Sequence, residues 1–400
     1  MTGVDAGALA RDVAALVQVP SVTGDERAAL ERLGEIATGM GLEASLDRHD
    51  LHALRAHPGY PGEEAARTEL WGLTVRAGAG DARLCLNGHV DVVGPGAQPW
   101  SRDPWSGAIA DGFVHGRGSA DMKGAVVAAL HGLAAVARSG RLGCEVVLQA
   151  VASEEDGGLG TFAALERDDR FDAALIPEPT AFAVACAQAG ALTFTGVVPG
   201  VSTHAAVRLE GVSAIDRYVD VHLALAEHER RINTDVAEPL LRDHPLPYPI
   251  SVGRVEAGRW SSQVPDRLEF EGRVGVRVGE TIDEARAAFE AVVRDACPEA
   301  TVEWTGGQFA PGTTPADHPF CVLVRDAAAS VLDAPPPFVG VSYGSDLRHF
   351  SSRGIPVVMF GTRGLELAHG VDERVSIDEL AAVGRVVARV LERFGPSAAG

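Results

Sequence analysis

The sequence predicts an α/β fold, a mostly parallel sheet with helices on both faces that is interrupted by an inserted α+β module. Short apolar runs typical of buried strands alternate with longer runs of helical period, which is the pattern of a parallel sheet. The pattern changes to α+β after Gly190 and returns at Pro319. The 400 residues exceed what one hydrophobic core usually organises. We therefore expect two domains, one formed by residues 1–190 and 306–400 and the other by residues 191–305.

The expected elements follow one another along the chain. The first segment carries helices at Asp5–Val17, Asp25–Met40 and Met122–Arg138 and strands at Arg83–Asn87, Glu145–Val151 and Phe171–Ile176. The inserted module carries a β run at Leu192–Val198, helices at Ala214–Arg231 and Ile282–Cys297, and a proline-rich loop at Glu238–Pro249. The last segment carries a helix at Cys321–Leu332, a strand at Pro356–Phe360 and a helix at Ile377–Phe394. Strands of this kind are bounded by glycine and proline, and the helices have the 3.6-residue period of one apolar face.

Composition and charge exclude several classes of partner. The net charge of -20 disfavours nucleic acid and anionic membranes. Residues 1–10 lack a basic start followed by an apolar run, and no stretch reaches the roughly 20 apolar residues of a membrane span. The five cysteines are scattered and form no Cys-x-x-Cys pair, so we expect reduced core residues. These features favour a cytoplasmic protein with no nucleic acid or membrane partner.

Polar side chains follow four of the predicted strands. They are His89 and Asp91 after the first strand, Glu154 and Glu155 after the second, Glu178 after the third, and His369 after the strand at 356–360. In open α/β sheets the ligand crevice lies outside the carboxyl ends of the strands. Any one of these residues alone is more often an ordinary surface group. Imidazoles and carboxylates at four strand ends together favour a site for a pair of zinc ions, and hence a hydrolase.

The segment Gly116–Asp121 resembles a dinucleotide fingerprint, but Asp121 stands where the third glycine belongs, and no good strand is predicted before it. A carboxylate there would repel a pyrophosphate. The small residues instead allow a tight turn that directs Asp121 into the crevice, where one carboxylate can bridge two cations. Asp121, Glu155 and Glu178 would offset most of the charge of two zinc ions, which leaves Glu154 as a spare base.

A rival motif is the Gly-x-Ser-x-Gly segment Gly340–Gly344, with Ser342 as nucleophile and Asp346 and His369 following in triad order. The nucleophile elbow needs a strong strand before it, and residues 335–339 include three prolines. That interpretation also leaves the other carboxylates without a role. A non-catalytic binding protein is a further alternative, and the spare carboxylate of Glu154 argues against it.

Five blocks of the sequence, in order, resemble the signature of the two-zinc aminoacylase and carboxypeptidase family. This family includes acetylornithine deacetylase, succinyl-diaminopimelate desuccinylase and glutamate carboxypeptidase. The blocks are Leu86–Asp91, Gly116–Gly124, Ser153–Glu155, Glu178–Thr180 and His369–Glu373. The resemblance covers nearly the whole chain, from the first helix to the last.

The resemblance implies a role for each candidate ligand. One zinc ion would be held by His89, Asp121 and Glu178, and the other by Asp121, Glu155 and His369, with cobalt or manganese as possible substitutes. Asp91 would orient His89, and Glu154 would take a proton from the bridging water and pass it to the leaving amine. A cis peptide bond between Asp121 and Met122 is also implied.

The inserted module resembles the lid and dimerisation domain of this family. His204 would reach the partner subunit's site in a homodimer and stabilise the oxyanion. The family's lid carries an arginine for the substrate carboxylate where this chain has Gly275. Arg273 and Arg277 share the face of that strand position, and which of them binds the substrate is open. We also expect Gly344 and Ser345 to contact the substrate.

Two departures bear on the substrate. The desuccinylases have an arginine just before the glycine that opens the lid, and this chain has Ala189 there. Glu178 resembles the deacylases and glutamate carboxypeptidases, because the family's dipeptidases usually have aspartate. Asp372 replaces a frequent asparagine with no assignable consequence. We therefore expect a deacylase of small N-acyl amino acids that resembles acetylornithine deacetylase, and a dipeptidase or glutamate-type carboxypeptidase is the alternative.

Overall fold

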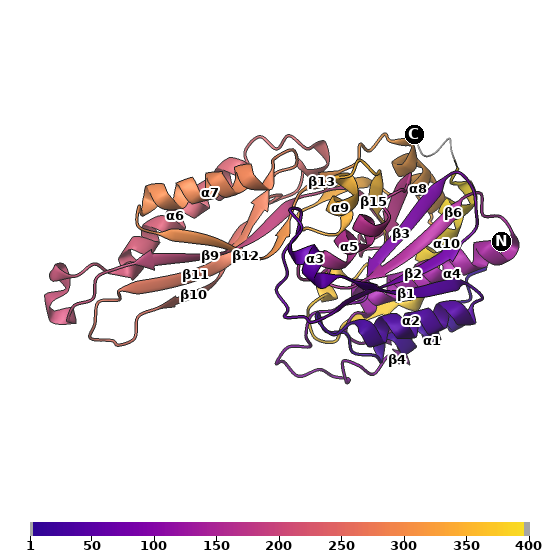
Figure 1. Ribbon diagram of the computed structural model, residues 1–400, viewed down its shortest axis with the longest axis horizontal. Helices are drawn as coiled ribbons and strands as arrows, with labels where there is room; N and C mark the ends of the chain where they lie inside the picture. The colour runs from indigo at the N-terminus through magenta and orange to yellow at the C-terminus, as the bar shows by residue number, and fades with distance from the viewer. Residues whose placement is uncertain (1–2, 396–400) are drawn as a thin grey trace. The chain divides into compact units, whose positions relative to one another are not determined.

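The computed structural model describes residues 3–395, and the chain forms two compact units. Unit 1 comprises Met1–Cys186, Thr313–Val339 and Ser345–Gly400, and unit 2 comprises Ala187–Gly312 and Gly340–Gly344. The module expected at residues 191–305 lies inside unit 2. Figure 1 shows the course of the chain through both units.

The larger sheet has a parallel centre. Within residues 3–395 it has nine strands in the order β1-β2-β6-β3-β7-β15-β8-β13, and β14 pairs with β8. The strands are β1 (Glu43–His49), β2 (Leu70–Ala77), β3 (Arg83–His89), β6 (Glu145–Val151), β7 (Ala173–Ile176), β8 (Val184–Gln188), β13 (Gly312–Thr313), β14 (Phe338–Val341) and β15 (Val357–Met359). The neighbours β6, β3, β7 and β15 are parallel, while β1, β2 and β8 pair antiparallel beside them. The predicted α/β class is confirmed.

Helices cover both faces of this sheet. They are α1 (Ala6–Val17), α2 (Arg27–Gly39), α3 (Leu51–Arg55), α4 (Gly124–Ser139), α5 (Leu159–Arg167), α8 (Pro319–Ala329), α9 (Leu347–Ser351) and α10 (Ile377–Arg393). Successive strand residues point to opposite faces. On β3, the Asn87 side chain donates a hydrogen bond to Thr161 of α5. The next residue, Gly88, lies so close to α4 that a Cβ on it would be 2.7 Å from the side chain of Val126. Thus α4 and α5 lie on opposite faces, and Gly88 permits the close approach of α4.

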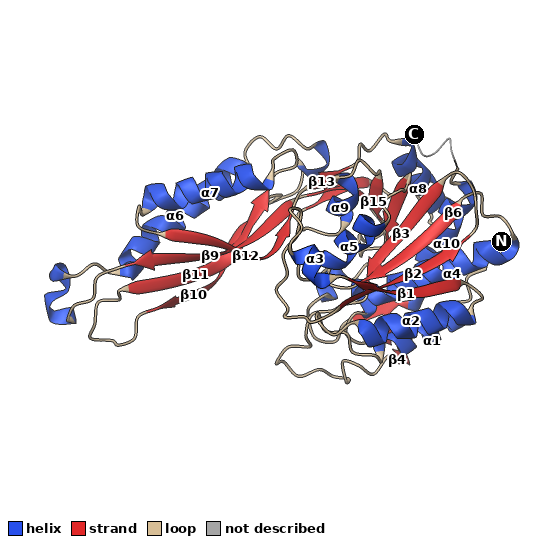
Figure 2. Ribbon diagram, viewed as in Figure 1, coloured by secondary structure: helices blue, strands red, loops and turns tan. Residues whose placement is uncertain are grey.

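Unit 2 is an antiparallel sheet with two long helices on one face (Figure 2). Its strands, in the order β10-β11-β9-β12, are β9 (Gly190–Pro199), β10 (Ile250–Ala257), β11 (Arg267–Val276) and β12 (Thr301–Phe309). Its helices are α6 (Ala214–Ile232), α7 (Ile282–Ala296) and the short turns η2 (Ala205–Glu210) and η3 (Pro239–Leu241). Every second residue of β9 is buried, and Phe194 packs against Phe270 and Phe289 in the core under the helices.

A third, small sheet in unit 1 connects segments that are far apart in the sequence. It consists of β4 (Ala108–Ala110), β5 (Phe113–His115) and β16 (Arg374–Ser376), all antiparallel. β5 precedes the glycine motif at residue 116, where no good strand was predicted. All five cysteines are buried and none forms a disulfide, as predicted. Among the described residues, one helical segment, Ser119–Ser139, has the length and apolarity of a membrane span, and 89% of its window is buried inside the protein, as in an ordinary core helix.

Candidate metal centre

Four of the five candidate ligands, all except Asp121, follow the carboxyl ends of the four parallel strands of unit 1. His89 is the last residue of β3, the turn with Glu154 and Glu155 follows β6, and Glu178 follows β7. The chain after β15 passes through the short turn η4 (Leu365–Leu367) to His369. Because these strands are parallel neighbours, their carboxyl ends lie at one edge of the sheet.

Asp121 lies between the two histidines. Its Oδ1 is 3.2 Å from Nε2 of His89, and its Oδ2 is 3.6 Å from Nε2 of His369. Glu178 Oε1 lies 3.8 Å from the same nitrogen of His89, and Glu155 Oε2 lies 3.0 Å from that of His369. Each histidine therefore faces one carboxylate of its own and one oxygen of the shared Asp121.

The loop that presents Asp121 turns sharply. Asp121 and Met122 lie in a distorted helical turn, η1 (Ser119–Lys123). The peptide bond between them is cis, as the family resemblance implied. Gly116 and Gly118 have φ of 138° and 80°, conformations that other residues rarely adopt. The glycines thus permit the predicted tight turn.

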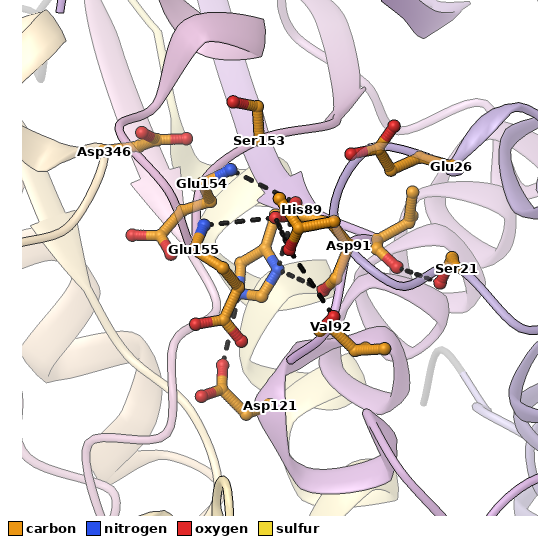
Figure 3. Close-up of polar contacts among 12 residues, drawn as sticks. Ser21, Glu26, His89, Asp91, Val92, Asp121, Ser153, Glu154, Glu155 and Asp346 are labelled. Atoms are coloured by element: carbon orange, nitrogen blue, oxygen red, sulfur yellow. Dashed lines mark hydrogen bonds and ion pairs between the residues drawn. The ribbon is translucent and has the colours of Figure 1, made fainter. Parts of the chain in front are cut away.

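Asp91 makes contacts that were not predicted for it (Figure 3). The Nδ1 atom of His89 lies 2.9 Å from the backbone carbonyl of Asp91 and 3.6 Å from its carboxylate. The two carboxylate oxygens instead accept hydrogen bonds from the backbone N–H groups of Glu154 and Glu155, each at 3.1 Å. Asp91 therefore fixes the turn that carries both glutamates, in addition to supporting His89.

The acidic residues of the site are buried close together. Burial raises the pKa of Glu154, Glu155 and Glu178, and neighbouring carboxylates raise the pKa of each further. A hydrogen bond to Glu155 raises the pKa of His369. Imidazole nitrogens and carboxylate oxygens are the ligands of zinc, and divalent cations would offset the buried negative charge. The residues present therefore fit a metal centre, and one group of oxygen and nitrogen atoms, from His89, Asp121 and Glu155, lies within 4.8 Å of one another.

Sequence reasoning missed the support of the glutamate turn. Asp156 accepts two hydrogen bonds of 3.1 Å from Nη2 of the buried Arg67, and Arg67 also contacts Glu26 at 3.3 Å. The backbone N–H groups of Glu64 and Ala65 donate to Asp156 as well. No local pattern marks Arg67, because its partner is 89 residues away. The acidic run 154–156 was the available signal for Asp156.

The serine-hydrolase interpretation finds no support in the contacts of its triad. The strand β14 does precede Ser342, although residues 335–339 predicted a poor one. Asp346, however, accepts a 2.6 Å hydrogen bond from the hydroxyl of Thr161, and His369 faces Asp121 and Glu155. The predicted acid and base of the triad are thus committed to other groups.

Ser345 belongs to unit 1, and its hydroxyl contacts Met359 Sδ at 3.1 Å. The remaining predicted residues belong to unit 2. His204 caps the N-terminus of η2, where its Nδ1 accepts a hydrogen bond from the backbone N–H of Ala206 at 3.1 Å. The guanidinium of Arg273 lies 5.3 Å from the centre of the Phe309 ring, and a Cβ on Gly344 would lie 2.6 Å from that residue.

Arg277, the second candidate for the substrate carboxylate, has a carboxylate partner within the chain. Its Nε and Nη2 lie 3.2 Å from the two carboxylate oxygens of Glu280. At Gly275, a Cβ would lie 2.7 Å from the backbone of Tyr248. This strand position therefore has no room for the arginine that the family carries there.

Known proteins resemble this chain in sequence and in fold. Residues 85–393 match the model of peptidase family M20/M25/M40. A succinyl-diaminopimelate desuccinylase of Gluconacetobacter diazotrophicus is 28% identical, over 96% of each chain. The metallo-carboxypeptidase Sso-CP2 of Sulfolobus solfataricus has a TM-score of 0.75 at 15% identity, over 95% of this chain and 97% of the other. The YXEP protein of Bacillus subtilis, a dinuclear metal-binding peptidase, has a TM-score of 0.65 at 15% identity, over 97% and 98%.

Proposed function

The chain belongs to peptidase family M20/M25/M40 and is a hydrolase acting on amides, and we propose that it is a zinc-dependent deacylase of N-acyl amino acids. The observation that carries the proposal is Asp121, which directs one carboxylate oxygen at each of two histidines. A shared carboxylate is the group that a two-metal site needs.

Five residues would hold the two ions. His89, Asp121 and Glu178 would hold one zinc ion, and Asp121, Glu155 and His369 the other; cobalt or manganese are possible substitutes. When bound, two such ions polarise the scissile carbonyl and lower the pKa of the attacking water. The dinuclear site of the Bacillus subtilis relative supports a pair rather than a single ion.

Glu154 is the proposed general base. Its backbone N–H is held by Asp91 at 3.1 Å, so that its carboxylate projects from a fixed turn. Burial raises the pKa of this carboxyl group. A group with a raised pKa can keep the proton that it takes from water long enough to deliver it to the leaving amine.

Arg273 is the proposed partner of the substrate carboxylate. Arg277 is already paired with Glu280, and a substrate would have to displace that carboxylate. Arg273 instead lies over the face of Phe309, a contact that leaves the N–H groups at the edge of the guanidinium available for a carboxylate. We place Gly344, which packs on Phe309, and Ser345 beside the same substrate.

A second copy of the chain is the proposed partner. Ile215, Val219 and Leu223 follow one another at intervals of four along α6, with 45%, 50% and 62% of each exposed, and so form one apolar stripe. β10 is an edge strand of the unit 2 sheet, and edge strands invite pairing with another chain. In the homodimer, His204 would complete the partner's site.

A substrate panel tests the proposal. The zinc-loaded protein should hydrolyse N-acetyl and other small N-acyl amino acids faster than dipeptides, and should lose this activity when the carboxylate is esterified. Arg273→Met should raise KM for the free acids, and the matched Arg277→Met should leave KM unchanged. Faster cleavage of dipeptides would favour the peptidase alternative. No hydrolysis of any amide by the zinc-loaded protein would refute the proposal.

A further inference from the structure

We propose that Glu373 is a positioning residue that holds the Asp121 loop and the His369 loop in register, so that both histidines face the shared carboxylate. Glu373 lies four residues after His369 and more than 250 residues after the loop it contacts. The inference rests on the proposed function, because the register matters only if these side chains hold metal.

The position of Glu373 follows from the small sheet of unit 1. β16 pairs antiparallel with β5, with Arg374 opposite His115. The next pair along continues this ladder, because the backbone N–H of Gly116 donates to the carbonyl of Glu373 at 2.9 Å. The backbone of Glu373 therefore ends the ladder at the residue where the loop to Asp121 begins.

The side chain of Glu373 then binds that loop through both of its oxygens. Oε1 accepts hydrogen bonds from the backbone N–H groups of Ala120 at 2.9 Å and Asp121 at 3.2 Å. Oε2 accepts from the backbone N–H of Gly118 at 3.0 Å and from Nη1 of Arg117 at 2.8 Å. The four donors lie within five consecutive residues, and the carboxylate is 1% exposed.

This arrangement excludes a direct role for Glu373 as a ligand or a base. An ionised carboxylate offers about four lone-pair sites, and four donors occupy them. Burying a charge is costly unless it is paired and hydrogen-bonded, and here every site is satisfied by the loop. Glu373 therefore acts through the residues it holds and not on the substrate.

Holding the loop determines where Asp121 points. The backbone N–H of Asp121 is itself one of the four donors, so a shift of Glu373 moves the residue whose carboxylate faces both histidines. Glu373 immediately precedes β16, and the chain before it leads directly from His369. Asp372, one of the three residues between them, accepts hydrogen bonds from the backbone N–H and the hydroxyl of Ser101 at 2.7 and 2.8 Å, which fixes the His369 loop on its other side.

Zinc retention by the Glu373→Gln variant tests this inference. An amide keeps the length of the side chain but turns an NH₂ group toward N–H donors. Mutating outer-shell partners of metal ligands typically weakens metal binding roughly 10- to 100-fold. The holoenzyme and the variant are dialysed against graded EDTA at a temperature where both are folded by circular dichroism, and bound zinc is counted. The visible absorption of the cobalt-loaded proteins reports ligand geometry independently.

Val375→Ala is the matched control. Val375 is 2% exposed and lies in β16, the strand that follows Glu373, opposite Val114, and it contributes none of the four hydrogen bonds. We expect Val375→Ala to lower the unfolding temperature without lowering the affinity for zinc. We expect Glu373→Gln to lose zinc at an EDTA concentration roughly 10- to 100-fold lower than wild type does, and its cobalt-loaded form to have a changed absorption spectrum.

The possible outcomes separate the inference from the proposed function. Equal zinc retention and unchanged cobalt spectra in Glu373→Gln, or equal zinc loss in Val375→Ala, would overturn the inference. If Glu373→Gln does not fold, the Arg117→Met variant is measured instead, because it removes one of the four hydrogen-bond donors to Glu373. Several-fold weaker zinc binding by Arg117→Met supports the inference, and zinc binding equal to that of the wild type overturns it. A wild-type protein that binds no zinc would instead refute the proposed function.

Discussion

The contacts of Asp91 lead to a prediction that separates two roles of one residue. Replacing Asp91 by Asn leaves the backbone carbonyl, which lies 2.9 Å from His89 Nδ1. The substitution alters the carboxylate, whose oxygens hold the N–H groups of Glu154 and Glu155. An amide has one oxygen, so one of the two N–H groups would face an NH₂ group instead of an acceptor.

The size of the effect follows from the lost hydrogen bond. A hydrogen bond to a charged group contributes about 1.5–3 kcal/mol. Asp91 is fully buried, so water does not replace the lost acceptor. If the loss displaces Glu154 mainly in the transition state, kcat should fall roughly 10- to 150-fold, since about 1.4 kcal/mol is tenfold in rate.

Steady-state kinetics with a zinc count measures this. We expect Asp91→Asn to lower kcat by that factor with KM nearly unchanged and zinc retained at the His89 position. Asp12→Asn is the control, because Asp12 also contacts a histidine, His131 at 2.8 Å, and it should keep wild-type kcat. An unchanged kcat in Asp91→Asn, or zinc lost in proportion to kcat, would refute the reasoning; the second result would show that the carboxylate acts through His89.

Three further predictions follow from the proposed mechanism and the ion pairs. Glu154→Gln should lower kcat by roughly 10²- to 10⁴-fold with both zinc ions bound, and near-normal turnover would exclude the base. Mixing inactive Glu154→Gln and His204→Ala proteins should restore activity, because one site of a mixed dimer is intact; no recovery after confirmed subunit exchange would exclude the trans arrangement. A hydrogen bond from Arg83 holds the pKa of Asp168 below its ordinary 3.8, so Asp168 stabilises the folded state above that pH and loses this effect as the pH falls. The difference in unfolding temperature between wild type and Asp168→Asn should therefore narrow below about pH 4, and a gap independent of pH would contradict the ion pair.

Burial explains part of the accuracy of the sequence predictions but not all of it, because the buried strands β2 and β8 were not predicted either. β6 has the predicted bounds, Glu145–Val151, because it is an apolar strand in the sheet interior. β1 was not predicted, since Glu43–His49 is a half-exposed edge strand rich in polar residues. Residues 335–339 were predicted to form a poor strand because they include three prolines. The prolines lie before β14 and not within it, so they do not weaken its hydrogen bonds.

The candidate site also contains residues that the sequence predicted and residues that it did not. Ligand candidates could be found from the sequence because they stand at the ends of recognisable strands. The residues that hold these ligands could not, since Arg67 and Glu373 contact partners 89 and 253 residues away. Such pairings depend on the tertiary fold, and no local period encodes them, although Glu373 is the last residue of the block His369–Glu373.

The number of zinc ions that restore activity tests the central claim most directly. Chelation should inactivate the enzyme, and returning zinc should restore full hydrolysis of N-acyl amino acids at two equivalents per subunit, as a two-metal site requires. His369→Ala should reduce the count to one, and Ser342→Ala should change neither the count nor the activity. Activity that survives complete removal of metal, together with its loss in Ser342→Ala, would contradict the account.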